Sequence, residues 1–449
     1  MAIATRTQQG TRPRLLQAAL DAFAQPDIRQ KLLYTIGLLV VFRFVAHVPI
    51  PGVNPDILQQ VFEGNDILNF FNLFSGGALR RLSVASLGVY PYISASIVMT
   101  LLQPIVPSLQ ALSREGEQGR RRIQLYTHWL AVPLALVQGY TQLIILDRSG
   151  VFQGSGFSPS FSGPNALPTA AALISMAAGT MFLVWLGELI TENGIGNGVS
   201  LIIFGGIVAG MPSLLPQITE SSLGFGGLAM LVAIGIAVLA LIVFFQEAQR
   251  RIPVQYARSV FRSGRMYRQS GASHIPLRVN SAGMIPLIFA LSVVIFPSSA
   301  ADYVRNQWEG GTLETIANWV VDVMRPQSPG FMVAVFALVV IFTFFYTLVV
   351  FQQQNLAENL QKQGGFIPGI RPGRPTAEYI MRVLVRITWA GAFFLGVVAI
   401  IPYVFTRFTG VQQLTLSSTG LLIVVGVVLD TMRQLEAQLL MRNYEGFIR

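Results

Sequence analysis

The stretch FMVAVFALVVIFTFFYTLVVF, residues 331–351, contains no charged side chain. An α-helix rises about 1.5 Å per residue, so about 20 apolar residues are enough to cross the hydrocarbon core of a bilayer. Comparable apolar runs recur along the chain, at about 32–49, 84–105, 123–146, 166–190, 199–216, 228–245, 283–300, 384–405 and 414–429. The sequence therefore predicts an all-α integral membrane protein with ten transmembrane helices.

The composition agrees with this class of protein. Of the 449 residues, 52% are hydrophobic and 12% are charged, and the mean hydropathy is +0.56. Soluble domains carry about 25% charged residues, so a soluble globular protein and a disordered chain are both excluded. The chain has no Cys, which excludes disulfides, thiolate metal ligands and cysteine nucleophiles.

The basic residues indicate the orientation. With the N-terminus in the cytoplasm, 24 of the 31 Lys and Arg residues fall in cytoplasmic segments and 6 in external ones, while Arg43 lies within the first span. Cytoplasmic loops of membrane proteins carry an excess of Lys and Arg. Both termini are therefore expected in the cytoplasm, and topology accounts for the net charge of +10.

The ten predicted spans divide into two sets of five. The predicted regions are a cytoplasmic segment 1–31, an N-terminal half 32–216, an external link 217–227, a C-terminal half 228–434 with cytoplasmic loops 247–281 and 352–382, and a cytoplasmic tail 435–449. In the first segment, Leu15, Leu16, Ala19 and Phe23 recur at helical spacing and predict an amphipathic surface helix. Because five is odd, the second half enters the membrane from the opposite side, as in inverted repeats around a central pathway.

Residues 65–82, NDILNFFNLFSGGALRRL, are too short to span a bilayer and too apolar for an ordinary loop. Two interpretations fit this segment. One is a helix that rests on the external membrane interface. The other is a re-entrant half-helix in a central cavity, because irregular backbone at membrane depth is tolerated only inside protein or beside a cavity.

The second and seventh spans each place a pair of residues on one helix face. Val89 and Ile93 are four positions apart, as are Ile288 and Ser292, and residues at this spacing are neighbours on a helix surface. Ordinary packing and a narrow apolar ring in a pore would both give this pattern.

The sequence offers no convincing catalytic site. His47, His128 and His274 are scattered without metal-ligand spacing. The glycines of GIGNGVSLIIF, residues 194–204, allow a tight turn but do not match a phosphate-binding loop. No acidic residue falls near the middle of a span, where ion-coupled carriers commonly keep one. We therefore expect no catalytic, metal or cofactor site, and the chain is not expected to be an enzyme.

The two long cytoplasmic loops combine positive charge with aromatic residues. Loop 247–281 holds seven Arg and one Glu, with Tyr256, Phe261 and Tyr267 among them. This pattern favours docking onto an acidic protein or RNA, although orientation of the chain would need the charge alone.

These features together resemble the SecY family, the large pore-forming subunits of the bacterial Sec protein translocase. The matching motifs are FRFVAHVPIPG (42–52), NLFSGGALRRLSVASLGVYPYISASI (72–97), REGEQGRRRIQLYT (114–127), WLGELITENGIGNGVSLIIFGGIVAG (185–210), RRIPVQYA (250–257), NSAGMIP (280–286), GGFIPGIRPGRPTAEYI (364–380) and LLIVVGVVLDTMRQLEAQL (421–439). The resemblance runs in order from about residue 28 to the C-terminus.

The resemblance implies two pseudo-symmetric halves around a central pore, which a plug helix closes from outside and an aliphatic ring narrows midway. The plug would be about 65–79, including Leu68, Phe70, Phe71, Asn72, Phe74, Ser75, Gly76 and Gly77. The ring would be Val89, Ile93, Ile203, Ile288, Ser292 and Ile423. A lateral gate between the second and seventh spans would involve Pro91, Ser94, Pro286 and Ile288.

The resemblance also implies a function and partners. The chain would pass unfolded secretory polypeptides across the bacterial plasma membrane and release signal sequences and transmembrane segments sideways into lipid. SecE and SecG would be its small membrane subunits. The SecA ATPase or a ribosome would dock on Arg262, Arg265, Arg371 and Arg374. The alternative is a ten-span transporter of a small solute, which predicts a polar midplane site and short cytoplasmic loops, while a purely structural scaffold predicts neither plug nor pore.

Overall fold

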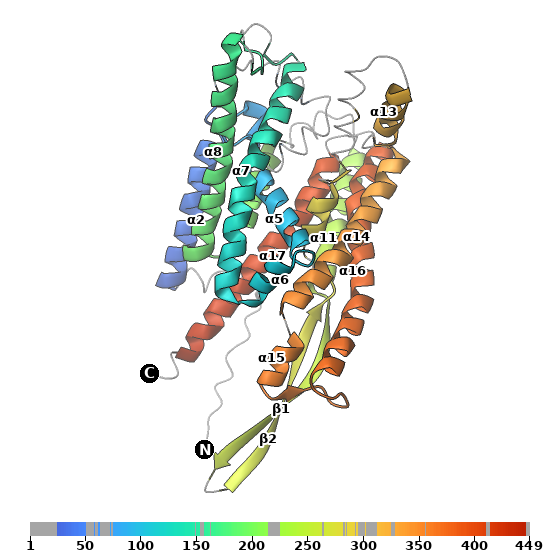
Figure 1. The fold of residues 1–449 in the computed structure, drawn as a ribbon. Coiled ribbons are helices and arrows are strands. Elements are labelled where there is room, and N and C mark those ends of the chain that lie inside the picture. Colours follow the sequence, from blue (N-terminus) through green and yellow to red (C-terminus); the bar gives the residue numbers. More distant parts are fainter. Residues whose placement is uncertain are drawn as a thin grey trace.

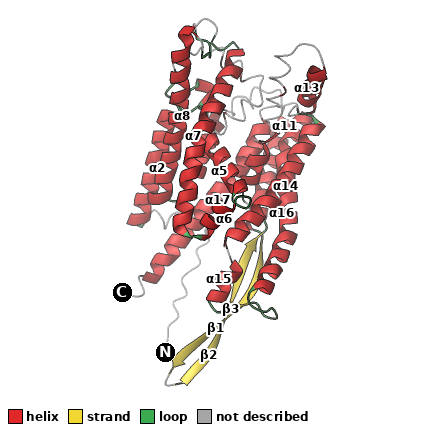
Figure 2. Ribbon diagram, in the orientation of Figure 1, coloured by secondary structure: helices red, strands yellow, loops and turns green. Residues whose placement is uncertain are grey.

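The computed structural model describes residues 25–50, 58, 62, 72, 75–148, 150–152, 157–161, 163–213, 225–262, 265–281, 283, 285–291, 293–294, 301, 312–324, 328–354, 356–409 and 414–445. These parts form two bundles of long helices side by side, with a two-stranded ribbon projecting from one end (Figure 1). The described chain is mostly helical and its strands are confined to that end (Figure 2). The helical architecture predicted from the sequence is confirmed. The predicted surface helix near residues 15–23 lies outside the described residues.

The first bundle carries the spans predicted for the N-terminal half. Its helices are α2 (Pro26–Val45), α5 (Tyr90–Leu102), α6 (Pro107–Arg114), α7 (Glu117–Arg148), α8 (Ala166–Asn193) and α9 (Gly198–Gly210). α8 is the central helix of this bundle, because α2, α5, α7 and α9 all contact it.

The second bundle carries the spans predicted for the C-terminal half. Its helices are α11 (Phe225–Glu247), α13 (Thr312–Val323), α14 (Pro329–Gln354), α15 (Leu356–Lys362), α16 (Arg374–Thr409) and α17 (Leu414–Glu445). Residues 285–291 and 293–294 of the predicted seventh span are also helical. α16 packs against α14 and α17, and α17 also contacts α9 of the first bundle.

The described helices differ in length. Four are long and apolar enough to cross a membrane, namely Glu117–Asp147, Gly163–Asn193, Pro329–Lys362 and Arg374–Ile401. α5 and α6 form one more if they are taken together as a single span bent by 98°. Shorter apolar helices cover Gly198–Gly210 and Gly235–Glu247. The count of ten spans therefore stays a prediction.

Proline residues determine where α5 and α6 begin. The sequence predicts a span from 84 to 105 with Pro91 inside it, but the helix begins at Tyr90 and Pro91 lies in its first turn. Proline is tolerated there because the first N–H groups of a helix have no intrahelical partner. Pro107 begins α6 in the same way, so the chain bends sharply between the two helices.

The two long loops that are predicted to be cytoplasmic contain a sheet, which the sequence did not predict. β1 (Gln249–Arg262) pairs antiparallel with β2 (Arg265–Arg278), and β3 (Gly365–Phe366) adds to β1 opposite Gln255 and Tyr256. The physical reason is a short alternation within the charged loop. Ile252 and Val254 are buried while Arg251 and Pro253 are exposed, which is the period of two that a half-buried strand requires. The buried side chains pack with Leu360, Ile367 and Ile380.

The glycine-rich segment before α9 is a tight turn into that helix. The Asn197 side chain accepts a hydrogen bond from the Ser200 N–H (3.1 Å), which caps the start of α9. Gly198 lies directly against the backbone of Gly187 in α8, where a Cβ would overlap the carbonyl oxygen. The glycines at these two positions therefore allow close approach of α8 and α9.

Candidate functional site

The aliphatic residues assigned to the ring meet in the largest buried cluster. Val89, Ile203, Ile288 and Ile423 are 0%, 5%, 6% and 1% exposed and belong to this one cluster. Ile93 packs against it, and Ser292 lies outside the described residues. The four members come from the start of α5, from α9, from the helical residues 285–291 and from α17. Apolar side chains from both bundles therefore belong to one continuous buried core.

The end of the predicted plug is a compact turn held by its own hydrogen bonds. The Gly77 N–H donates to the Asn72 carbonyl oxygen (2.9 Å), and the Leu79 N–H donates to Ser75 Oγ (3.1 Å). The Arg80 N–H donates to Asn72 Oδ1 (3.0 Å), which closes the turn from the other side. Leu68, Phe70, Phe71 and Phe74 lie outside the described residues.

The predicted gate residues lie in the two helices expected to form the gate. Pro91 and Pro286 are buried, and Ile288 joins the central cluster together with Val89. Ser94 Oγ donates to the Tyr90 carbonyl oxygen (3.1 Å) and accepts from Gln138 Nε2 (3.4 Å), so α5 has a polar link to α7. The central cluster is thus where the two helices of the predicted gate share a buried environment.

The four predicted docking arginines fall at two places. Arg262 and Arg265 are opposite each other in the register of β1 and β2, at the tip of the hairpin. Arg371 and Arg374 are exposed in the second loop, where Arg374 Nε forms an ion pair with Glu378 Oε1 (3.2 Å). β3 joins the second loop to the hairpin. The two loops therefore form one structural unit, which the sequence did not reveal.

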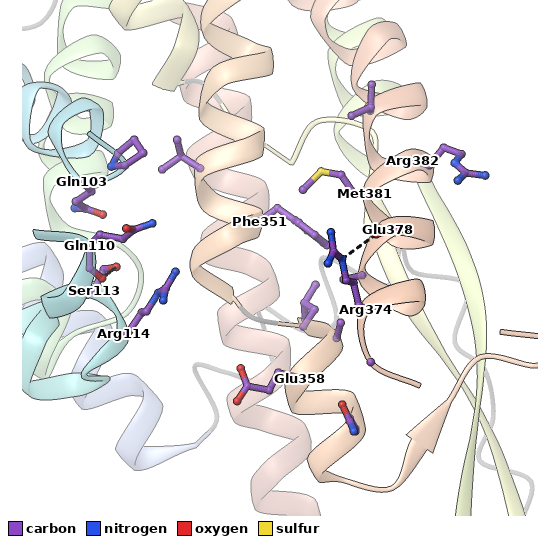
Figure 3. A pocket seen from close by; sticks show the side chains of 18 of the residues that line it. Gln103, Gln110, Ser113, Arg114, Phe351, Glu358, Arg374, Glu378, Met381 and Arg382 are labelled. Carbon is purple, nitrogen blue, oxygen red and sulfur yellow. Dashed lines mark hydrogen bonds and ion pairs between the residues drawn. The ribbon is translucent and has the colours of Figure 1, made fainter. Parts of the chain in front are cut away.

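Two further features, a cavity and a cluster of ion pairs, were not predicted from the sequence. A cavity of about 1050 Å³ lies between the α5–α6 bend and helices α14 to α16, and Arg114, Arg374, Arg382 and Arg386 are among its lining residues (Figure 3). A hairpin-base cluster joins β2, α11 and α17 through ion pairs of Arg433 with Glu247 (2.6 Å) and of Arg278 with Asp430 (3.6 Å). The sequence could not reveal either feature, because their residues are far apart along the chain.

The described residues contain no group of three or more His, Asp or Glu side chains placed to hold a metal ion. His128 Nε2 lies 2.9 Å from Glu188 Oε1, and Gln124 Nε2 donates to the same carboxylate (2.7 Å). The His128 ring also stacks on Tyr92 of α5. These contacts join α5, α7 and α8 within the first bundle.

Comparison with known proteins identifies the family. A SecY family model matches residues 83–432. Protein translocase subunit SecY of Streptomyces scabiei is 41% identical to this chain, over 97% of this chain and all of that one. The chain belongs to the SecY family. It is therefore a membrane protein of the translocase type, and its function as a protein-conducting channel, predicted from the sequence, is confirmed.

Solved structures show the same fold. A SecY protein whose plug domain is described as stabilising the closed state of the translocation channel matches with a TM-score of 0.60, at 17% identity and over 91% of both chains. Sec61 in a canine ribosome–channel complex from the endoplasmic reticulum matches with a TM-score of 0.59, at 16% identity and over 91% of both chains. The SecY relatives are named as translocase subunits, and the match gives no support to a small-solute transporter.

Proposed function

We propose that this chain conducts unfolded secretory polypeptides across the bacterial plasma membrane between its two bundles. The observation that carries the proposal is the convergence of Val89, Ile203, Ile288 and Ile423, from both bundles, on one buried cluster. These four residues, with Ile93 and Ser292, would form the constriction of the pore. Apolar side chains around a narrow gap exclude water and ions by dewetting, yet offer no polar group that would hold a passing chain.

The plug and the lateral gate complete this proposal. Residues 65–79 would occupy the external side of the constriction at rest and move aside when a polypeptide enters. The helix that begins at Tyr90 and the predicted seventh span would separate to expose an apolar segment to lipid. A signal sequence or transmembrane segment would then partition sideways, because its apolar surface is more favourable in lipid than in a wet pore.

Partners would supply the driving force and complete the assembly. The chain has no nucleotide-binding motif, so we propose that it is not itself an enzyme and that the SecA ATPase or a translating ribosome drives the polypeptide. The hairpin tip with Arg262 and Arg265, and the second loop with Arg371 and Arg374, would dock that partner on the cytoplasmic side, where both termini would also lie. SecE and SecG would be the small membrane subunits.

Disulfide crosslinking tests the pathway, because the chain has no native Cys. A Cys at Ile288 is paired with a Cys in a secretory chain stalled midway, in vesicles that contain SecE, SecG and SecA. A crosslink that needs both SecA and ATP is expected. Ile341→Cys is the matched control, since Ile341 is 59% exposed on α14 and would face lipid. Equal crosslinking at Ile288 and Ile341 would overturn the proposed constriction. So would the absence of crosslinks from Cys placed at Ile288 and at Ile203 while translocation proceeds.

A further inference from the structure

Arg43 joins the helix of the first predicted span to the end of the predicted plug. It lies in the last turn of α2, and its guanidinium Nη1 donates a hydrogen bond of 2.6 Å to the carbonyl oxygen of Gly76. The two residues are 33 positions apart in sequence, so the bond joins two separate segments. A charge-assisted bond of this kind is among the stronger hydrogen bonds in proteins.

The turn around Gly76 is also fitted closely against the bundle. Gly76 has a φ of +68°, and a Cβ built on it would lie 2.7 Å from Gly206 Cα and 2.8 Å from Phe42 Cζ. Phe42 is buried in α2, next to Arg43 in sequence, and Gly206 belongs to α9. Gly206 follows Ile203 by three residues, which is almost one helical turn. The turn therefore lies against α9 within one turn of the proposed constriction.

The charge of Arg43 gives its bond to Gly76 a further consequence. Arginine near the apolar part of a membrane needs polar partners, because an unpaired charge there is costly. Within the described ranges, Arg43 forms no ion pair, and the nearby like charge of Arg81 repels it. If the turn moved away, Arg43 would have to find water or another acceptor. The Gly76 carbonyl thus stabilises both the turn and the arginine.

We propose that Arg43 is a positioning residue that latches the end of the plug onto α2 and α9 when the channel is closed. The proposal rests on the assignment of residues 65–79 as the plug. Opening then requires two events at one place, namely the loss of the bond from Arg43 to the Gly76 carbonyl and the withdrawal of Gly76 from Gly206. Strengthening or weakening this latch would set how often the resting channel opens.

Ion leak through the purified chain in vesicles, reconstituted with its small subunits, tests the latch. Loss of a hydrogen bond made by a charged group should raise the leak about 10- to 100-fold in Arg43→Gln. Arg43→Lys keeps a charged donor and should restore much of the seal. Arg81→Gln is the matched control, because it removes an exposed charge that repels Arg43 but makes no side-chain bond to the turn, so it should not raise the leak. An Arg43→Gln channel that leaks no more than the unmodified one would overturn the proposal.

Variants at two adjacent glycines distinguish the effect of close docking on α9 from the effect of backbone strain. This comparison does not involve a change at Arg43. Gly76 and Gly77 have φ of +68° and +84°, so alanine strains the backbone at both. Only at Gly76 would the added Cβ meet neighbours, since a Cβ at Gly77 has nothing within 4 Å. Gly76→Ala should therefore leak much more than Gly77→Ala. Equal leak from the two variants would show that close docking on α9 has no part in closure.

Deletion of residues 65–79, measured in the same vesicles, tests the plug assignment separately from the proposed latch. If the deletion leaks while Arg43→Gln and Gly76→Ala remain sealed, the latch is wrong and the plug assignment stands. If the deletion itself stays sealed, the plug assignment is wrong and the latch falls with it. If all three leak and Arg81→Gln and Gly77→Ala do not, both are supported.

Discussion

Gly198, the first residue of α9, sets how closely that helix approaches α8. A Cβ built on Gly198 would overlap the carbonyl oxygen of Gly187 and lie 2.6 Å from its carbonyl carbon and 2.8 Å from its Cα. All three are backbone atoms, so a rotamer change cannot relieve the contact. Gly198→Ala must therefore move one helix relative to the other. Because α9 also carries Ile203, the displacement reaches the proposed constriction.

The expected cost of Gly198→Ala follows from two opposing effects. Overpacking by an added methyl group typically costs about 1–3 kcal/mol, and a contact with unyielding backbone falls at the upper end. Replacing Gly by Ala within a helix recovers about 0.5–1 kcal/mol. We expect a net loss of about 2 kcal/mol in the free energy of unfolding. Gly210→Ala, at the last residue of α9, is the matched control because a Cβ there has nothing within 4 Å.

Unfolding of the two variants in mixed detergent micelles gives the comparison, with tryptophan fluorescence as the signal. The Gly198→Ala chain should unfold at a lower denaturant concentration than the unmodified chain, and the Gly210→Ala chain should unfold at the same or a higher concentration. Ion leak in vesicles should rise in the first variant alone. Equal stability of the two variants would refute the reasoning, since it would mean that α8 and α9 do not depend on this approach.

Three further predictions concern other parts of the structure. A double-mutant cycle with Arg433→Gln and Glu247→Gln should give a coupling energy of about 0.5–1 kcal/mol. Solvent weakens this ion pair because the two side chains are 24% and 52% exposed, and purely additive effects would contradict it. Val254→Ala removes buried apolar volume beneath the sheet, so about 1.5 kcal/mol of local stability should be lost. Limited proteolysis should then cut the hairpin faster, and an unchanged cleavage rate would contradict the packing of Val254. Ile423→Ala should lower the free energy of unfolding by about 2–5 kcal/mol. Ile341→Ala, on an exposed face, should lower it by clearly less, and similar losses would show that Ile423 is not in a packed core.

Hydropathy was sufficient to predict a mostly helical chain but not where each helix begins or bends. The run 331–351 lies wholly within α14, because apolar length alone determines a span. At 84–105 the same criterion missed two local effects. Pro91 marks the first turn of α5, and the chain bends by 98° before α6. Where a helix begins and bends depends on which backbone N–H groups need hydrogen-bond partners. A hydropathy average over 20 residues contains no information about these groups.

The sheet and the candidate site were harder to predict for a different reason. Only Ile252 and Val254 keep the alternation of a strand visible among the arginines, and their burial depends on Leu360, more than 100 positions away. The spacing of Val89 and Ile93 fitted either a core or a pore, and only the family resemblance linked them with Ile423. Local patterns indicate which residues share a face, whereas the identity of the facing residues is a property of the folded chain.

α17 has a mechanical consequence for how the two bundles can part. It contacts α9 in the first bundle and α11 and α16 in the second, and at 32 residues it is about 48 Å long, longer than a bilayer core is thick. Among the described elements, no comparably extensive contact joins α5 or α7 to α14 or α16. Among the described elements, one edge of the interface is thus joined by more extensive helix contacts than the opposite edge. The bundles would therefore rotate about an axis near α17 rather than move apart in parallel, and the widest gap would form beside α5.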